Sequence, residues 1–170
     1  MVTKAVSVGK PGPMGALLAG LAAGAAGTTA LNLVTYLDMV VRARPASTTP
    51  ETTVRRAEEL AGVDLAARGP DSEEAGNRRS GIGALLGIVA GVGTGAVYGL
   101  VRNRLARVPL PVLGAGVGIA VNVGTTGPMA AMGVTDPRHW SGSSWLSDLV
   151  PHLAYGLVTA AVYDAIRGGR

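Results

Sequence analysis

The sequence predicts an all-α membrane protein, a bundle of four transmembrane helices with one amphipathic helix on its surface. Residues 11–37, 80–101 and 108–135 contain no Asp, Glu, Lys or Arg. Each of these stretches exceeds the about 20 residues that a helix needs to cross the hydrocarbon core. Charged residues make up only 15% of the chain, against about 25% in typical soluble domains. We therefore expect a single membrane domain over residues 1–170.

The first span covers residues 12–41, and a polar loop that contains the amphipathic helix covers residues 42–79. Thr48 and Glu51 have the spacing of a capping box, and Gly62 suits the end of a helix. The helix has an apolar face and a charged face. The apolar residues are Val54, Ala57, Leu60 and Ala61, and the charged residues are Arg55, Arg56, Glu58 and Glu59. Residues 69–79 are rich in glycine, serine and charge, which is typical of a flexible segment.

Glycine recurs at every fourth position of the second span, residues 80–101. The ridge comprises Gly83, Gly87, Gly91, Gly95 and Gly99. A glycine inside a helix costs about 1 kcal/mol relative to alanine in water, whereas in a bilayer small residues let a second helix backbone approach closely. The ridge is longer than a four-span bundle requires, so we expect these helix-packing glycines to contact a second copy or a larger membrane complex.

The third and fourth spans cover residues 109–133 and 144–166. Trp140 and Trp145 precede the fourth span, where tryptophan anchors a chain at the level of the lipid headgroups. Ser143 or Ser144 could cap the fourth helix.

The sequence also indicates an internal duplication of two helical hairpins. Residues 94–102 match residues 159–167 at five of nine positions, including a tyrosine and the closing arginine. The first and third spans match when they are offset by 90 positions, and Asn32 then corresponds to Asn122. Shared composition is the alternative, because segments rich in glycine and alanine align easily. A duplication would relate the hairpins by an axis along the membrane normal.

Several polar side chains within the spans form a candidate polar site. They are Asn32, Asp38, Asn122, Asp148, His152 and Tyr155. Ionisable groups in a membrane are costly and mark functional sites, and histidine titrates near neutral pH. One possible pocket is symmetric and lined by Asn32, Asn122, Tyr98 and Tyr163. The alternatives are hydrogen bonds between helices and, for Asp38, an ion pair with Arg42 four residues later.

Motifs for chemistry are absent from the sequence. There is no cysteine, and the two histidines are thirteen positions apart without the ligands of a metal site. Residues 91–96 satisfy a G-x-G-x-x-A pattern, but they lie inside a span without a preceding strand. We expect no catalytic residue, metal or cofactor, and no nucleic-acid partner, because no basic patch contains interleaved aromatic residues.

Two stretches, GTTALNLVTYLDMVVRARPAS (residues 27–47) and GVTDPRHWSGSSWLSDLVPHLAYG (residues 133–156), resemble uncharacterised small multi-pass membrane proteins of actinobacteria. The resemblance implies the same four-span layout and no known activity. It highlights Asn32, Tyr36, Asp38, Arg44, Pro45, Asp136, Pro137, Trp140, Asp148, Pro151, His152 and Tyr155. Together with the charges nearby, it suggests a cap at one membrane face. The members of this cap would be Asp38, Arg42, Arg44, Asp136, Arg138, His139, Asp148 and His152.

These observations predict an integral membrane protein of structural or accessory type, which packs through its glycine-rich helices with itself or with a larger membrane complex. The alternative is a small transporter or channel with a polar site between the helices. We expect the chain in the cell membrane, surrounded by lipid. The basic residues that flank the spans favour cytoplasmic termini.

Overall fold

The computed structural model describes residues 12–65, 69 and 71–168, and every regular element in them is helical. The α-helices are α1 (Pro13–Arg42), α2 (Thr49–Ala61), α3 (Glu73–Val101), α4 (Leu110–Ala131) and α5 (Gly142–Ile166), with short 3₁₀ segments at Arg102–Leu105 and Pro137–His139. Four of the helices are long and apolar enough to cross a membrane, α3 together with the 3₁₀ turn that follows it. The predicted all-α fold with four spans is confirmed.

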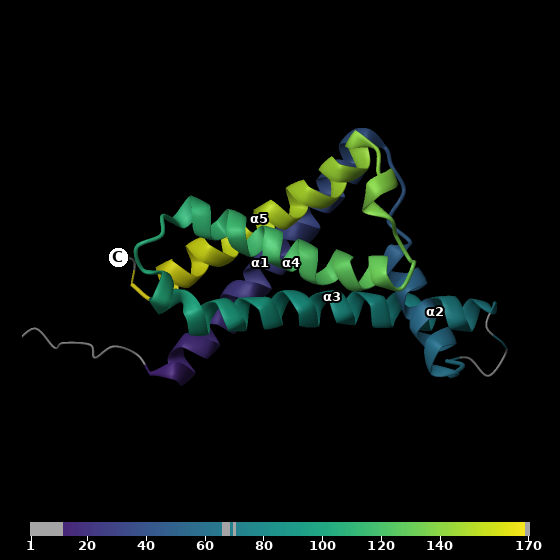
Figure 1. Cartoon of the computed structure of the whole chain (residues 1–170), viewed down its shortest axis with the longest axis horizontal. Coiled ribbons are helices and arrows are strands. Elements are labelled where there is room, and N and C mark those ends of the chain that lie inside the picture. The colour runs from purple at the N-terminus through teal and green to yellow at the C-terminus, as the bar shows by residue number, and fades with distance from the viewer. Residues whose placement is uncertain (1–11, 66–68, 70, 169–170) are drawn as a thin grey trace, which may run out of the picture.

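The four long helices form a bundle in which α1 packs against both α3 and α5, and α4 packs against α5. α1 and α5 run diagonally across Figure 1, with the end of α1 beside the start of α5, whereas α3 and α4 follow the long axis. We call the end that carries α2 and the α4–α5 connection the loop end. The opposite end, where α1 begins and α5 finishes, is the terminal end. α3 and α4 contact each other only weakly.

The outer surface of the bundle is apolar and its interior consists of small residues. Val40, Val41 and Val89 are 79%, 80% and 67% exposed, whereas Ala23 and Ala160 are fully buried. A water-soluble fold would place these valines inside, and a lipid environment favours them outside. The chain is therefore a multi-pass integral membrane protein.

Glycine allows the close approach of α1 and α3. A Cβ on Gly95 would lie 2.5 Å from the Gly20 oxygen and 2.6 Å from the Gly24 nitrogen. A Cβ on Gly24 would lie 2.8 Å from the Gly91 oxygen. Carbon atoms do not approach backbone atoms this closely, so each position requires glycine in this packing.

The other ridge glycines differ in their surroundings. Gly99 faces Gly20 and Tyr163, Gly91 faces Thr28 and Tyr155, and Gly83 faces Pro50 of α2. Among the five ridge glycines, only Gly87 would carry a Cβ with no neighbouring atom within 4 Å. Four of the five ridge glycines thus have partners within the chain. The expectation that the ridge is too long for the chain's own packing is wrong, because its glycines contact residues of α1, α5 and α2.

The two hairpins, α1–α3 and α4–α5, repeat the same glycine contacts. A Cβ on Gly24 would lie 3.0 Å from the Val92 Cα, and a Cβ on Gly114 would lie 2.8 Å from the Leu157 Cα. These residues correspond under the offsets of 90 and 65 positions that align the spans. Gly91 packs on Thr28 as Gly156 packs on Gly118, which are again corresponding positions. The agreement between contacts and sequence offsets supports a duplication.

The two repeats are not packed symmetrically against each other. Gly27 of α1 lies against Tyr155 and Thr159 of α5, but Val117 stands at the corresponding position of α4. A valine side chain keeps two helices further apart than a glycine does. This difference accounts for the weak contact between α3 and α4 beside the extensive contact between α1 and α5.

The amphipathic helix α2 packs on the start of α3, but with a different face from the predicted one. Val54 and Glu58 are buried, whereas Leu60 is 63% exposed. Glu58 was expected on the charged, solvated face; it lies inside because the Arg79 guanidinium donates to its carboxylate. The same hydrogen bond holds the pKa of the Glu58 carboxyl below its ordinary value.

Helix ends differ from the sequence predictions at three places. Thr48 precedes α2 without a side-chain capping bond, although Gly62 ends that helix in the left-handed conformation, with φ 65°. α3 begins at Glu73 rather than after a flexible segment, because Ser72 accepts from the Ala75 N–H. The cap of α5 is Ser141 rather than Ser143 or Ser144.

Candidate functional site

Asn122 of α4 meets Asp148 and His152 of α5, and we call these three residues the α4–α5 polar cluster. The Asn122 Nδ2 donates to an Asp148 carboxylate oxygen and lies 3.2 Å from the His152 Nδ1. The His152 Nδ1 lies 3.8 Å from the other carboxylate oxygen. Asn122 is 8% exposed, and the side chains of His152 and Asp148 are 15% and 24% exposed. Three of the six predicted site residues therefore come together.

The hydrogen bonds indicate the tautomer of His152. Its Nδ1 lies 2.6 Å from the backbone oxygen of Asp148. A carbonyl oxygen only accepts, so we assign the hydrogen to Nδ1, which donates to this oxygen and does not accept from the Asn122 amide. The second ring nitrogen, Nε2, is then the atom that can take up a further proton.

The α4–α5 polar cluster lies within the span region, in the half nearer the loop end. Asn122 follows the start of α4 by about 18 Å along the helix axis, and His152 follows the start of α5 by about 15 Å. The hydrocarbon core is about 30 Å thick. Asp148 follows the start of α5 by only about 9 Å, so the pair lies between the loop-end surface and the centre of the core. Ionisable groups within a span are costly and tend to be functional.

Small residues bring these two helices together at the α4–α5 polar cluster. A Cβ on Gly118 would lie 2.5 Å from the His152 backbone oxygen and 3.0 Å from the Leu153 Cα. Gly118 precedes Asn122 by one helical turn, and the turn of α5 that starts at Asp148 faces it. The glycine contacts therefore set the spacing at which the Asn122 amide reaches the carboxylate.

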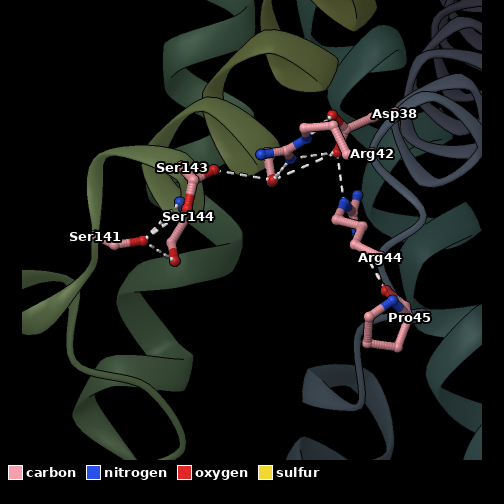
Figure 2. Close-up of polar contacts among 8 residues, drawn as sticks. Asp38, Arg42, Arg44, Pro45, Ser141, Ser143 and Ser144 are labelled. Carbon is pink, nitrogen blue, oxygen red and sulfur yellow. Dashed lines mark hydrogen bonds and ion pairs between the residues drawn. The ribbon is translucent and has the colours of Figure 1, made fainter.

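Asp38 lies outside the α4–α5 polar cluster, in a network at the loop end that Figure 2 shows. Its carboxylate accepts from Arg42 at 2.6 Å and from Arg44 at 2.5 Å. Arg42 also donates to Ser147 of α5. The predicted ion pair between Asp38 and Arg42 is confirmed, and Ser147 extends it into a connection between α1 and α5 that the sequence did not reveal.

The remaining predicted site residues lie apart. Tyr155 is fully buried, and its hydroxyl donates to the Gly91 oxygen at 2.6 Å. Tyr163 donates in the same way to the Gly99 oxygen at 3.0 Å. These are hydrogen bonds between helices, as in the structural alternative. Asn32 is exposed.

The symmetric pocket that the sequence suggested does not form. The rings of Tyr98 and Tyr163 pack edge to face with centroids 5.4 Å apart, in a core cluster with Leu113 near the terminal end. Asn122 belongs to the α4–α5 polar cluster. Asn32 belongs neither to that cluster nor to the core cluster that contains the two tyrosines. The sequence similarity of the two hairpins does not lead to a symmetric site, because the hairpins pack asymmetrically.

The predicted charged cap divides into three separate sets of contacts. Besides the Asp38 network and the α4–α5 polar cluster, Asp136 accepts from Arg138 and His139 at 2.9 Å each. The hydrogen bonds from Arg138 hold the pKa of the Asp136 carboxyl well below its usual range. The eight residues therefore do not converge on one site.

Two polar features of the bundle ends were not recognised from sequence. Arg102 donates to Asp164 at 2.7 and 2.9 Å near the terminal end. At the loop end a shallow pocket of about 320 Å³ separates α2 from the segment after α4. The side of α2 that lines it includes Arg55 and Arg56. Among the described residues, no group of three His, Cys, Asp or Glu side chains could hold a metal ion.

Comparison with protein-family models, with curated proteins and with solved structures found no match. The similarity to small actinobacterial membrane proteins therefore has no support from these comparisons.

Proposed function

We propose that this protein is a small transporter that passes protons across the membrane, and that the proton is taken up at the α4–α5 polar cluster. The observation that carries the proposal is the contact between Asp148 and His152, 3.8 Å apart, in the loop-end half of the spans. A carboxylate and an imidazole both exchange protons with water. Placed together in a bilayer, they form a pair in which the charge of one compensates the other.

The arrangement supports a defined proton-binding step. With Nδ1 bound to a carbonyl oxygen, a proton adds at Nε2 of His152 and produces an imidazolium. Asp148, held by Asn122, supplies the counter-charge. Without Asp148 the imidazolium would be an unpaired charge in a low-dielectric environment, which is strongly unfavourable. Proton uptake at His152 is therefore expected to depend on Asp148.

Polar side chains continue from the α4–α5 polar cluster towards the terminal end. Along the inner side of α5, His152 is followed by Tyr155, Thr159 and Tyr163, all buried. Asp164, paired with Arg102, completes the row. Polar groups thus recur along α5 from His152 to Asp164, and the two tyrosine hydroxyls donate to backbone oxygens of α3.

Proton flux into liposomes tests the proposal. In vesicles that contain a pH-sensitive dye, Asp148→Asn and His152→Gln should each lower the flux of the wild type by at least about tenfold, which corresponds to about 1.4 kcal/mol. His139→Gln is the matched control, because the side chain of His139 is 81% exposed outside the spans. Wild-type vesicles without flux, or folded Asp148 and His152 variants with unchanged flux, would contradict the proposal.

The setting of this transporter is the cell membrane, with both termini in the cytoplasm. The basic residues that flank the spans in the sequence favour this orientation. They are Lys4, Lys10, Arg102, Arg104, Arg107, Arg167 and Arg170.

A structural or accessory role is the second candidate, in which the chain packs against itself or a larger membrane complex. Outward-facing glycines favour it, because a Cβ on Gly93, Gly116 or Gly124 would find open space. Such positions let a further helix approach closely. A partner that is retained in constant proportion during purification in gentle detergent would support this role, and retention of lipid alone would contradict it.

A further inference from the structure

We propose that two copies of this chain associate through the outer face of α1, with Asn32 of each copy hydrogen-bonded to Asn32 of the other. This inference goes beyond proton transport, and it identifies the partner that the accessory role requires as a second copy. The interface is a parallel pair of α1 helices related by a two-fold axis along the membrane normal.

Asn32 is an exposed amide at the depth of the hydrocarbon core. It lies about 15 Å along the helix axis from Arg42, and the half-thickness of the core is also about 15 Å. No hydrogen bond from another described residue reaches its side chain, and its surface is exposed. An amide that faces lipid without a partner costs several kcal/mol, so a partner outside the chain is required.

The internal duplication explains why Asn32 lacks a partner within the chain. Its counterpart Asn122 donates to Asp148 and lies beside His152. At the positions that correspond to these two residues, α3 has Gly83 and Gly87.

Neither glycine replaces the missing side chains. Gly83 packs against Pro50 of α2, and Gly87 faces open space. The first repeat therefore keeps the asparagine of the site without the groups that bind it.

The residues around Asn32 form a seam that suits a second helix. Exposed positions recur at alternating intervals of three and four, namely Ala22, Ala25, Thr29, Asn32 and Tyr36. This spacing is the period of left-handed helix pairs, and small residues at its first positions allow close approach.

A second copy is the occupant that the chemistry of Asn32 favours. The carboxamide is both donor and acceptor, so two of them across a two-fold axis can satisfy each other reciprocally. A two-fold interface brings the same residue of both copies together. Both copies insert with the same orientation, which makes the two α1 helices parallel. A central asparagine is also a known means of fixing register in such pairs.

Single-cysteine cross-linking in native membranes tests the interface, because the chain contains no cysteine. Ala25→Cys and Tyr36→Cys, which flank Asn32 on the seam, should each give a disulfide-linked dimer. Val89→Cys is the control on the outer side of α3. It is 67% exposed, and the contact between Gly91 and Thr28 places it at a similar depth.

Asn32→Leu in the Ala25→Cys background tests the role of the amide. A leucine faces lipid without cost, so the fold should persist, and the dimer should fall by about fivefold. Equal cross-linking at Val89→Cys, or a dimer that Asn32→Leu leaves unchanged, would overturn the proposal. A different protein linked to Ala25→Cys would also overturn it while leaving the accessory role intact. Absence of every cross-linked and copurified partner would contradict both.

Discussion

Replacing Gly95 by leucine is expected to separate α1 from α3, whereas the same replacement at Gly87 is expected to leave the bundle intact. Both glycines belong to the ridge of α3 and lie two turns apart. A Cβ on Gly95 would lie 2.5 Å from the Gly20 oxygen, and one on Gly87 would meet nothing within 4 Å. The obstacle at Gly95 is backbone, which cannot turn aside as a side chain can.

The expected loss of stability at Gly95 exceeds the about 1–3 kcal/mol that extra methylenes cost in a packed core, because a whole side chain must fit between two backbones. Unfolding in mixed micelles with increasing dodecyl sulfate, followed by circular dichroism, measures the difference. If Gly87→Leu were as damaging as Gly95→Leu, the ridge would pack along its whole length, and the assignment of Gly87 to open space would be incorrect.

Replacing Gly156 by alanine is expected to separate α4 from α5 and to abolish proton flux at the same time. The added Cβ would lie 2.8 Å from the Gly118 Cα and closer still to the Gly114 oxygen. α4 must then move away, and Asn122 no longer reaches Asp148. The free energy of unfolding of Gly156→Ala is expected to fall by about 1–3 kcal/mol. Its proton flux is expected to be as low as that of Asp148→Asn.

Gly124→Ala is the matched control for Gly156→Ala, since a Cβ on Gly124 of α4 would find open space. It should retain both stability and flux. A Gly156→Ala protein that keeps normal flux would show that the spacing between α4 and α5 is not what assembles the α4–α5 polar cluster. Flux and unfolding measured on the same preparation separate a loss of the site from a loss of the fold.

Elements set by local sequence were predictable. Uncharged stretches longer than a bilayer crossing identified three of the four spans, and Gly62 marked the end of α2. Asp38 and Arg42 form the ion pair that their spacing indicates. In each case the determinant lies within a few residues along the chain, where composition and periodicity carry the information.

Contacts between distant segments were not predictable from the same patterns. Glu58 is buried because Arg79 pairs with it across two helices, and helical periodicity alone placed it on the solvated face. The glycine ridge was recognised, but which helices it faces depends on how the hairpins pack.

The two asparagines show the same limit most clearly. Asn32 and Asn122 occupy equivalent positions in the repeated spans. Only Asn122 finds titratable partners, because their positions on α3 are taken by glycine. A polar residue in a span therefore indicates a site only when the facing helix supplies the other half.

The most direct test of the proton-binding site is the protonation of His152 itself. The chain has two histidines, so His139→Gln leaves His152 as the sole imidazole. Nitrogen-15 resonances of that ring, recorded in lipid bilayers as the pH is varied, report its protonation. We expect the Nε2 resonance to move from its neutral to its protonated position on acidification, and Asp148→Asn to suppress this change in a folded protein. A resonance that stays neutral throughout, or that moves equally in Asp148→Asn, would contradict this expectation.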